Sequence, residues 1–301
     1  GIRYLLRKDI ENHKWNRCIQ NAANGLCYSD SDFLDTMATE WSALVLNDYE
    51  AVMPLTQRRK FGINYLYQPA FCQQTGITML EPEANLTDCF LDAIPDKFKY
   101  WDIQLNALNS TVHYPHVQRK NYLLPLFSEQ FELTNKYHRN AIRNIRKAQD
   151  ENIIVKEDIP ASVLMKLHTT RFANRNRITV REYTSCEKLL DQWSRSLKAK
   201  IIGAQDANGD IIASSGYLIY KNRITFIING NNRQSLTNGA SFLLKDYIIR
   251  KYSGSDYILD FEGSDNQDFA RFYQQFGAET CEYYQAIKVN RLPGLLGWIK
   301  R

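Results

Sequence analysis

The stretch DFEGSDNQDFARFYQQFGAE, from Asp260 to Glu279, combines residue types that could carry chemistry. It is typical of a short apolar strand followed by a polar turn and a helix, and Tyr273 lies on that helix after Asn266 and Ala270. A phenol has a pKa of about 10, so at neutral pH it keeps its proton and can donate it to a leaving group. The alternative is an ordinary amphipathic helix, in which the tyrosine ring packs and the hydroxyl stays at the rim.

Two carboxylates, Asp260 and Glu262, stand at the end of the strand that precedes this helix. A carboxylate in such a place can act as a general base toward an incoming nucleophile. Because side chains alternate along a strand, only one of the two is expected to face a cleft. We take Glu262 as the candidate base, and its alternative role is a turn or helix-capping carboxylate beside Gly263.

A polar loop, GNNRQSLTNG, opens directly into the predicted helix ASFLLKDYIIRKY. The first amides of a helix lack partners within the helix and carry positive partial charge, so they can hold an anion. Asn238 and Gly239 tolerate positive φ, which makes an anion-binding nest feasible at this position. The alternative is a plain strand-to-helix connection that uses Asn and Gly for their geometry.

Positive charge is concentrated in one predicted helix within LFSEQFELTNKYHRNAIRNIRKAQDENIIV. The whole chain has a formal net charge of +5, which does not indicate a uniform nucleic-acid-binding surface. The basic residues of the helical stretch are Lys136, Arg139, Arg143, Arg146 and Lys147. Its predicted apolar side consists of Ala141, Ile142, Ile145 and Ala148. The basic side is either a solvated face or a grip on phosphate groups through Arg139, Arg143 and Arg146.

Composition excludes several other classes of protein. With 301 residues, 44% hydrophobic and 24% charged, the chain is expected to form one large or two medium globular domains. Its apolar runs are too short to span a bilayer, and no export signal precedes the first predicted strand, so we expect no membrane insertion and a cytoplasmic location. The six cysteines form no CxxC pair, and His113 and His116 have no ligand partner at suitable spacing, so no metal site is predicted.

The second half of the chain has a readable order of elements. Two predicted helices, ASVLMKLHTTRFA and SCEKLLDQWSRSL, are followed by three strands, KIIGAQD, IIASSGYLIY and RITFIIN. Asn208–Gly209 predicts a hairpin between the first two strands, and Ser185 is the expected N-cap of the second helix. After the polar loop come a helix, the strand YILDF, the helix with Tyr273, and a last strand near YYQAIKV.

The first half resembles a degenerate repeat of the same order of elements. DKFKYWDIQLNALN and RKYSGSDYILDFEGSDN share the order of helix end, aromatic strand and polar turn, which indicates an internal repeat. The first copy has no counterpart of the loop RQSLTNG. We therefore predict three parts: a degenerate first domain at 1–133, a basic linking helix at 134–152, and a donor-binding second domain at 153–301.

This order of elements resembles the GNAT acyltransferase fold over about 153–290. The basic helix and the motifs FEGS and RFYQQFGAE make the whole chain similar to the FemABX family, whose tandem GNAT-like domains transfer amino acids from aminoacyl-tRNA to peptidoglycan precursors. The resemblance implies an α+β fold with two mostly antiparallel mixed sheets flanked by helices. It also implies transfer of an acyl group from acetyl-CoA or another acyl-CoA to a primary amine, on a small molecule or a peptide-like acceptor.

The resemblance implies roles for particular residues. Tyr273 would protonate the departing thiolate, and Asn266 would contact the arm of the donor. The residues implied at the donor's pyrophosphate and pantetheine are Gln234, Ser235, Thr237, Asn238, Gly239, Ala240 and Ile228. FemABX transferases typically read RFK where this chain reads RFY, which favours acyl-CoA over aminoacyl-tRNA. The alternatives that remain are an aminoacyl-tRNA donor and a GNAT-fold binding module without catalysis.

Overall fold

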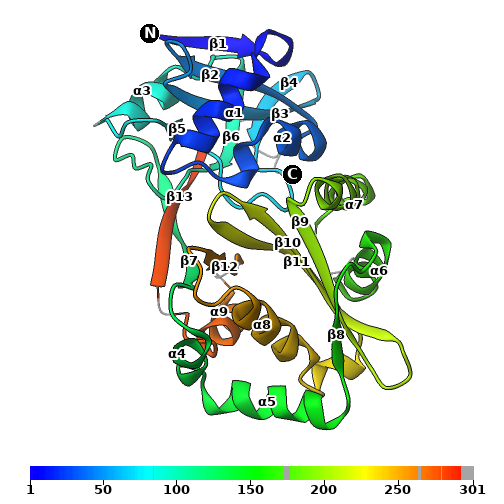
Figure 1. The fold of residues 1–301 in the computed structure, drawn as a ribbon. Coiled ribbons are helices and arrows are strands. Elements are labelled where there is room, and N and C mark those ends of the chain that lie inside the picture. The colour runs from blue at the N-terminus through cyan, green and yellow to red at the C-terminus, as the bar shows by residue number, and fades with distance from the viewer. Residues whose placement is uncertain (84, 173–176, 264–265, 279, 293–301) are drawn as a thin grey trace. The chain divides into compact units, whose positions relative to one another are not determined.

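The computed structural model describes residues 1–292 except 84, 173–176, 264–265 and 279 (Figure 1). Ser264, Asp265 and Glu279, which belong to the motifs discussed above, lie outside the described residues. The chain divides into two compact units. The first comprises Gly1–Arg119 with Tyr283–Arg301, and the second comprises Lys120–Glu282.

The first unit is built from a mixed sheet and short helices. Its elements in chain order are β1 (Ile2–Leu6), α1 (Asn12–Asn21), α2 (Ser31–Met37), β2 (Glu40–Leu46), β3 (Ala51–Lys60), β4 (Ile63–Tyr67), β5 (Thr78–Met79), α3 (Leu86–Asp92) and β6 (Phe98–Gln104), and β13 (Thr280–Asn290) returns to it. Phe90 and Leu91 of α3 pack against Trp101 and Leu66 of the sheet, all with 0% exposure. This apolar cluster is the core on that side of the sheet.

The second unit has a mixed sheet between two layers of helices. Its elements are β7 (His116–Pro125), α4 (Gln130–Asn135), α5 (Arg139–Asp150), β8 (Ile154–Lys156), α6 (Ala161–Phe172), α7 (Val180–Arg195), β9 (Ala199–Gln205), β10 (Ile211–Tyr220), β11 (Arg223–Asn231), η3 (Gln234–Leu236), α8 (Ala240–Lys251), β12 (Ile258–Asp260) and α9 (Gln267–Gln274). The pair α6–α7 lies on one side of the strands and α8 on the other, with α5 packed outside α8 (Figure 1).

The two units share one pattern of strand pairing. In the first, the order is β1-β2-β3-β4-β6-β13, with antiparallel pairs up to β4, a parallel β4–β6 pair and an antiparallel β6–β13 pair. In the second, β8-β9-β10-β11 are antiparallel, β11–β12 is parallel and β12–β7 is antiparallel. β6 and β12 hold equivalent places, which confirms the predicted internal repeat and the α+β class.

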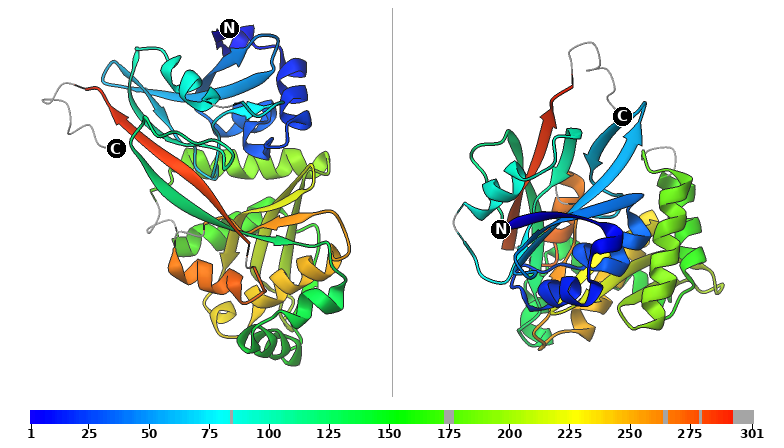
Figure 2. Two further views of the ribbon diagram at one scale, coloured as in Figure 1. Left: turned by 90° about the vertical axis from the view of Figure 1, so that its left-hand side faces the viewer. Right: turned by 90° about the horizontal axis from the view of Figure 1, so that it is seen from above.

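Each sheet is completed by a strand from the other half of the sequence. β7 follows β6 in the chain but pairs with β12, while β13 follows β12 and pairs with β6 through Ala286–Asn290. Figure 2 shows the red strand β13 returning to the blue and cyan unit. The units therefore differ from the predicted division at 133 and 152. The basic helix belongs to the second unit, and most of the strand near YYQAIKV belongs to the first.

Local signals placed most elements of the second unit. Gly209, with φ of +91°, forms the predicted turn between β9 and β10. The expected N-cap of α7 was wrong, because the helix begins earlier. Thr179 caps it in a reciprocal capping box with Glu182, and Ser185 lies inside the helix.

Candidate active site

The parallel pair β11–β12 separates after three residues. Arg223–Thr225 of β11 pair with Ile258–Asp260 of β12, and β11 then continues to Asn231 alongside β10 alone. A β-bulge interrupts the β10–β11 register, since Gly216 faces Ile228 while the next residue, Tyr217, faces Phe226. Bulges bend a strand and are frequent beside active sites. The edge of β11 beyond Thr225 is therefore turned away from β12.

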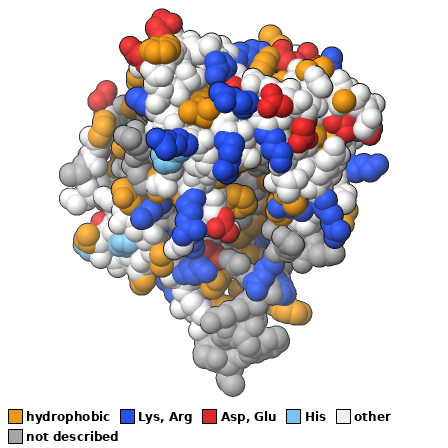
Figure 3. Space-filling model, turned by 90° about the horizontal axis from the view of Figure 1, so that it is seen from below, with side chains coloured by type: hydrophobic (Ala, Val, Ile, Leu, Met, Phe, Trp, Pro, Cys, Tyr) orange, Lys and Arg blue, Asp and Glu red, His pale blue; other side chains and the backbone are white. Residues whose placement is uncertain are grey.

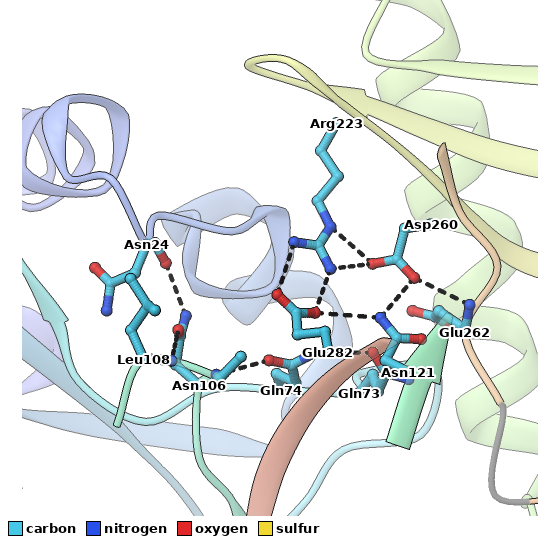
Figure 4. A network of polar contacts seen from close by, with 11 residues as sticks. Asn24, Gln73, Gln74, Asn106, Leu108, Asn121, Arg223, Asp260, Glu262 and Glu282 are labelled. Carbon is cyan, nitrogen blue, oxygen red and sulfur yellow. Dashed lines mark hydrogen bonds and ion pairs between the residues drawn. The ribbon is translucent and has the colours of Figure 1, made fainter. Parts of the chain in front are cut away.

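The point of separation is held by a network around a buried carboxylate (Figure 4). Asp260 has 0% exposure and accepts hydrogen bonds from Arg223 Nε at 2.7 Å, Asn121 Nδ2 at 2.9 Å and the Glu262 amide at 3.0 Å. Arg223 Nη2 also reaches Glu282 Oε2 at 2.7 Å. The Arg223 guanidinium thus lies between the carboxylates of Asp260 and Glu282. Together with Asn121, these contacts join the start of β11 and the end of β12 to β7 and β13.

This network bears on which of the two carboxylates, Asp260 or Glu262, could act as the base. Asp260 is fully buried, and its carboxylate oxygens already accept from Arg223, Asn121 and the Glu262 amide, so it is not placed to meet a substrate. Glu262 follows in the left-handed region, with φ of +51°, which is uncommon for a residue with a side chain and is often found at functional sites. Glu262 remains the candidate base, in the turn that leads to α9.

Tyr273 is buried in the core of the second unit. Its ring is 6% exposed and stacks on Phe261 with 4.7 Å between ring centroids. Burial raises the pKa of Tyr273, and the nearby charges of Glu262 and Asp260 raise it further. The structure thus brings Tyr273 and Glu262 into one electrostatic neighbourhood, with the phenol protonated at neutral pH.

The loop before α8 satisfies much of its own hydrogen bonding. Asn232 Oδ1 accepts from the Ser235 amide at 3.0 Å, and Asn238 Oδ1 accepts from the Ala240 amide at 3.1 Å. The Thr237 amide donates to the carbonyl of Gln234. These are amides that the predicted pyrophosphate site would have used. As it stands, the loop is not a good fit to a pyrophosphate.

A close helix contact explains the glycine of this loop. Gly239 has φ of +81°, and a Cβ placed there would lie 2.0 Å from the carbonyl oxygen of Asn144 in α5. The backbone of α5 therefore passes directly against the start of α8, which leaves a helix N-terminus with restricted access. Gly239 is required by geometry and packing, which was the alternative reading of the loop.

Two other predicted donor contacts have local partners. Asn266 caps α9, because its Oδ1 accepts from the Asp268 amide at 2.9 Å. Ile228 is 2% exposed, and its Cγ2 would lie 3.2 Å from a Cβ on Gly216. These contacts are within the protein, and they do not show either side chain facing an open cleft.

The basic helix α5 has the predicted two-sided character. Ala141, Ile145 and Ala148 are buried, whereas Ile142 is 44% exposed and does not belong to the packed side. The side chains of Arg139, Arg143 and Arg146 lie on the exposed face, and Arg143 Nη2 donates to Asn140 Oδ1 at 2.7 Å. α5 is at the bottom of Figure 1, and Figure 3, drawn from below, shows many Lys and Arg side chains on this face.

A hollow of about 310 Å³ lies beside the start of α5, lined by His138, Asn140, Arg271, Gln274 and Gln275. The His138 amide donates to the carbonyl of Gln275 at 2.9 Å, so α5 and α9 are joined here. The hollow combines polar side chains with an arginine, which suits an anionic group. It lies next to the predicted phosphate-binding arginines.

Sequence reasoning missed Asn121, Arg223 and Glu282. They are far apart in the sequence and have no motif spacing, so only the meeting of β7, β11, β12 and β13 in the folded chain could reveal them. Among the described residues, no group of three or more His, Cys, Asp or Glu side chains is arranged to hold a metal ion. In the same part of the chain, no helix is both long and apolar enough to cross a membrane.

No family model and no curated protein sequence matches this chain. Solved structures do match it over nearly its full length. FemX superimposes with a TM-score of 0.65 at 12% identity, covering 97% of this chain and 99% of FemX. L-PGS from Bacillus licheniformis gives 0.55 at 12% identity, covering 95% and 93%.

A tandem GNAT protein from the clavulanic acid biosynthesis pathway gives a TM-score of 0.53 at 10% identity, covering 98% of this chain and 100% of that protein. At such identities the likeness concerns the fold. It agrees with the repeated strand pattern, with its parallel pair in each unit, described above. The chain therefore shares its fold with FemX and with a tandem GNAT protein.

Proposed function

We propose that the protein is an N-acyltransferase, in which a primary amine attacks the acyl carbonyl of a donor directly. The observation that carries this proposal is the separation of β11 from β12 beside Tyr273 and Glu262. A strand edge released from its neighbour offers backbone amides to a donor and to its carbonyl oxygen. The likeness in fold to tandem GNAT proteins and to FemX supports this class of reaction.

The proposed roles follow from the chemistry of the side chains. Glu262 accepts the proton that the amine loses as its nitrogen bonds to the carbonyl carbon. When the bond from the carbonyl carbon to the leaving group breaks, Tyr273 supplies a proton to that group. The raised pKa of Tyr273 means that its hydroxyl keeps its proton until the leaving group departs.

The first candidate donor is an acyl-CoA, and its weak point is the loop before α8. The Ser235 and Ala240 amides already have acceptors within the loop, and the α5 backbone lies against Gly239. An acyl-CoA donor would therefore require the loop to rearrange or its pyrophosphate to bind elsewhere. The tandem GNAT protein from the clavulanic acid biosynthesis pathway, described in its form without AcCoA, supports this donor class.

These same observations favour aminoacyl-tRNA as the second candidate donor. Such a donor needs no pyrophosphate site at α8, and the exposed arginines of α5 and the hollow lined by Arg271 offer positive charge for an RNA backbone. A peptidoglycan precursor would then be the amine acceptor, as the FemABX resemblance implies. Tyr273 in place of the lysine of the RFK motif is the feature against this donor.

Calorimetric titration of the protein with acetyl-CoA and, in parallel, with aminoacyl-tRNA tests the donor. Transfer to a panel of primary amines then tests the reaction, with Tyr273→Phe as the variant. We expect binding of one donor, and transfer that Tyr273→Phe reduces without loss of donor affinity. Binding without transfer to any amine would support a binding module, and unchanged transfer in Tyr273→Phe would remove its proposed role.

A further inference from the structure

α8 carries a lysine whose ammonium group lies inside the second unit. Lys245 is 3% exposed, and its Nζ donates to Asn229 Oδ1 at 2.7 Å and to Ser215 Oγ at 3.0 Å. The same atom lies 3.5 Å from the centroid of the Phe226 ring. Among the described residues, no carboxylate forms an ion pair with it. The Nζ atom thus donates to two neutral oxygens and lies over an aromatic ring, and it has no anionic partner among the described residues.

Core packing does not account for this lysine. Burial lowers the pKa of Lys245 well below its ordinary value, because a charge removed from water without a counter-charge is unfavourable. A methionine of similar length would fill the same space without that cost. The polar contacts of the Nζ atom, not its stem, are therefore what distinguishes the residue.

The contacts of Lys245 converge on Asn229. Ser215 Oγ donates to Asn229 Oδ1 at 2.7 Å, so lysine and serine hold the same oxygen. From the opposite face of the sheet, His168 Nδ1 donates to the backbone carbonyl of Asn229 at 2.7 Å. Asn229 lies in the part of β11 that has left β12, beyond Thr225.

We propose that Lys245 is a positioning residue of the acyl-transfer site, which fixes the free edge of β11 by holding Asn229 for the donor. The role of that edge rests on the proposed function, whereas the grip on Asn229 does not. Asn229 pairs with Ser215 of β10, just beyond the bulge at Gly216–Tyr217, whereas the pairing of β11 with β12 has ended at Thr225. A side-chain clamp from α8 replaces the order that β12 would otherwise supply.

Lys245→Met tests the proposal, with Lys251→Met as matched control on the same helix. Lys251 is partly exposed and paired with Glu157, so its replacement removes a lysine of α8 without touching β11. Using whichever donor the wild type accepts, we expect Lys245→Met to raise the donor KM about tenfold, with a smaller change in kcat. Its melting temperature should equal or exceed that of the wild type. Lys251→Met should leave the KM unchanged, and an unchanged KM in Lys245→Met would overturn the proposal.

Amide hydrogen exchange separates this inference from the proposed function. In Lys245→Met we expect exchange at 226–231 to become about tenfold faster, with exchange in β9 unchanged. Asn229→Leu should have the same effect, and Asn229→Asp, which keeps the acceptor oxygens, should not. If the wild type transferred no acyl group from either donor, the proposed function would fail, and the exchange data would still decide the role of Lys245. Unchanged exchange at 226–231 would refute the clamp.

Discussion

Replacing Arg223 by methionine removes the cation that lies between Asp260 and Glu282. Asp260 has 0% exposure and would keep only Asn121 and the Glu262 amide as donors. Breaking a buried ion pair from one side typically costs about 3–5 kcal/mol, because the remaining charge stays uncompensated. Since two neutral donors remain, we expect Arg223→Met to lower the free energy of unfolding by about 3 kcal/mol. Urea unfolding followed by circular dichroism measures this loss as a shift in midpoint at constant m.

Two further variants decide whether burial of Asp260 is the cause. Glu282→Gln leaves the Arg223–Asp260 pair in place, and the Glu282 side chain is 20% exposed, so a loss of about 1 kcal/mol or less is expected. The double variant Arg223→Met/Asp260→Leu removes both charges and should be more stable than Arg223→Met alone. A loss below about 1 kcal/mol in Arg223→Met, or additive losses in the double variant, would refute the reasoning.

Three other predictions follow from single contacts. Gly239→Ala should cost about 3 kcal/mol by thermal or urea unfolding because of the clash with Asn144, whereas Gly62→Ala, with similar φ and nothing within 4 Å, should cost about 1 kcal/mol from strain alone. Equal losses would show that the helix contact is not tight. Tyr273→Phe should lower kcat at least about 100-fold at unchanged donor affinity, measured by steady-state kinetics and calorimetry, and a smaller loss would argue against proton donation. The pKa of Lys245 is lowered in the folded state, so between that pKa and about 10.5 the unfolded chain holds more protons than the folded chain. Over this range the wild type should therefore gain stability relative to Lys245→Met as the pH rises. Melting temperatures of both proteins between about pH 7 and 9.5 measure this gain, and a constant difference would contradict it.

The sequence by itself determined the elements of the second unit and the plan of the fold. Apolar periodicity and the Asn208–Gly209 turn act within a few residues, and such short-range signals are readable from one chain. The repeat of an aromatic strand before a polar turn indicated two related halves. The stretch from Asp260 to Glu279 singled out Tyr273 and Glu262, which the structure places close enough to interact.

Only the tertiary structure decided which strands complete each sheet and which groups gather at the separation of β11 from β12. The pairing of β7 with β12 and of β13 with β6 joins segments far apart in the sequence, and local propensity does not indicate such pairing. Asp260 is buried and accepts from Arg223, and Gly239 packs against Asn144, so both roles depend on partners far away in the sequence. Lys245 reads as an ordinary surface residue of an amphipathic helix, and only its burial against Asn229 makes it a candidate for function. The physical reason is that burial and charge pairing belong to the packed chain, whereas propensity belongs to the segment.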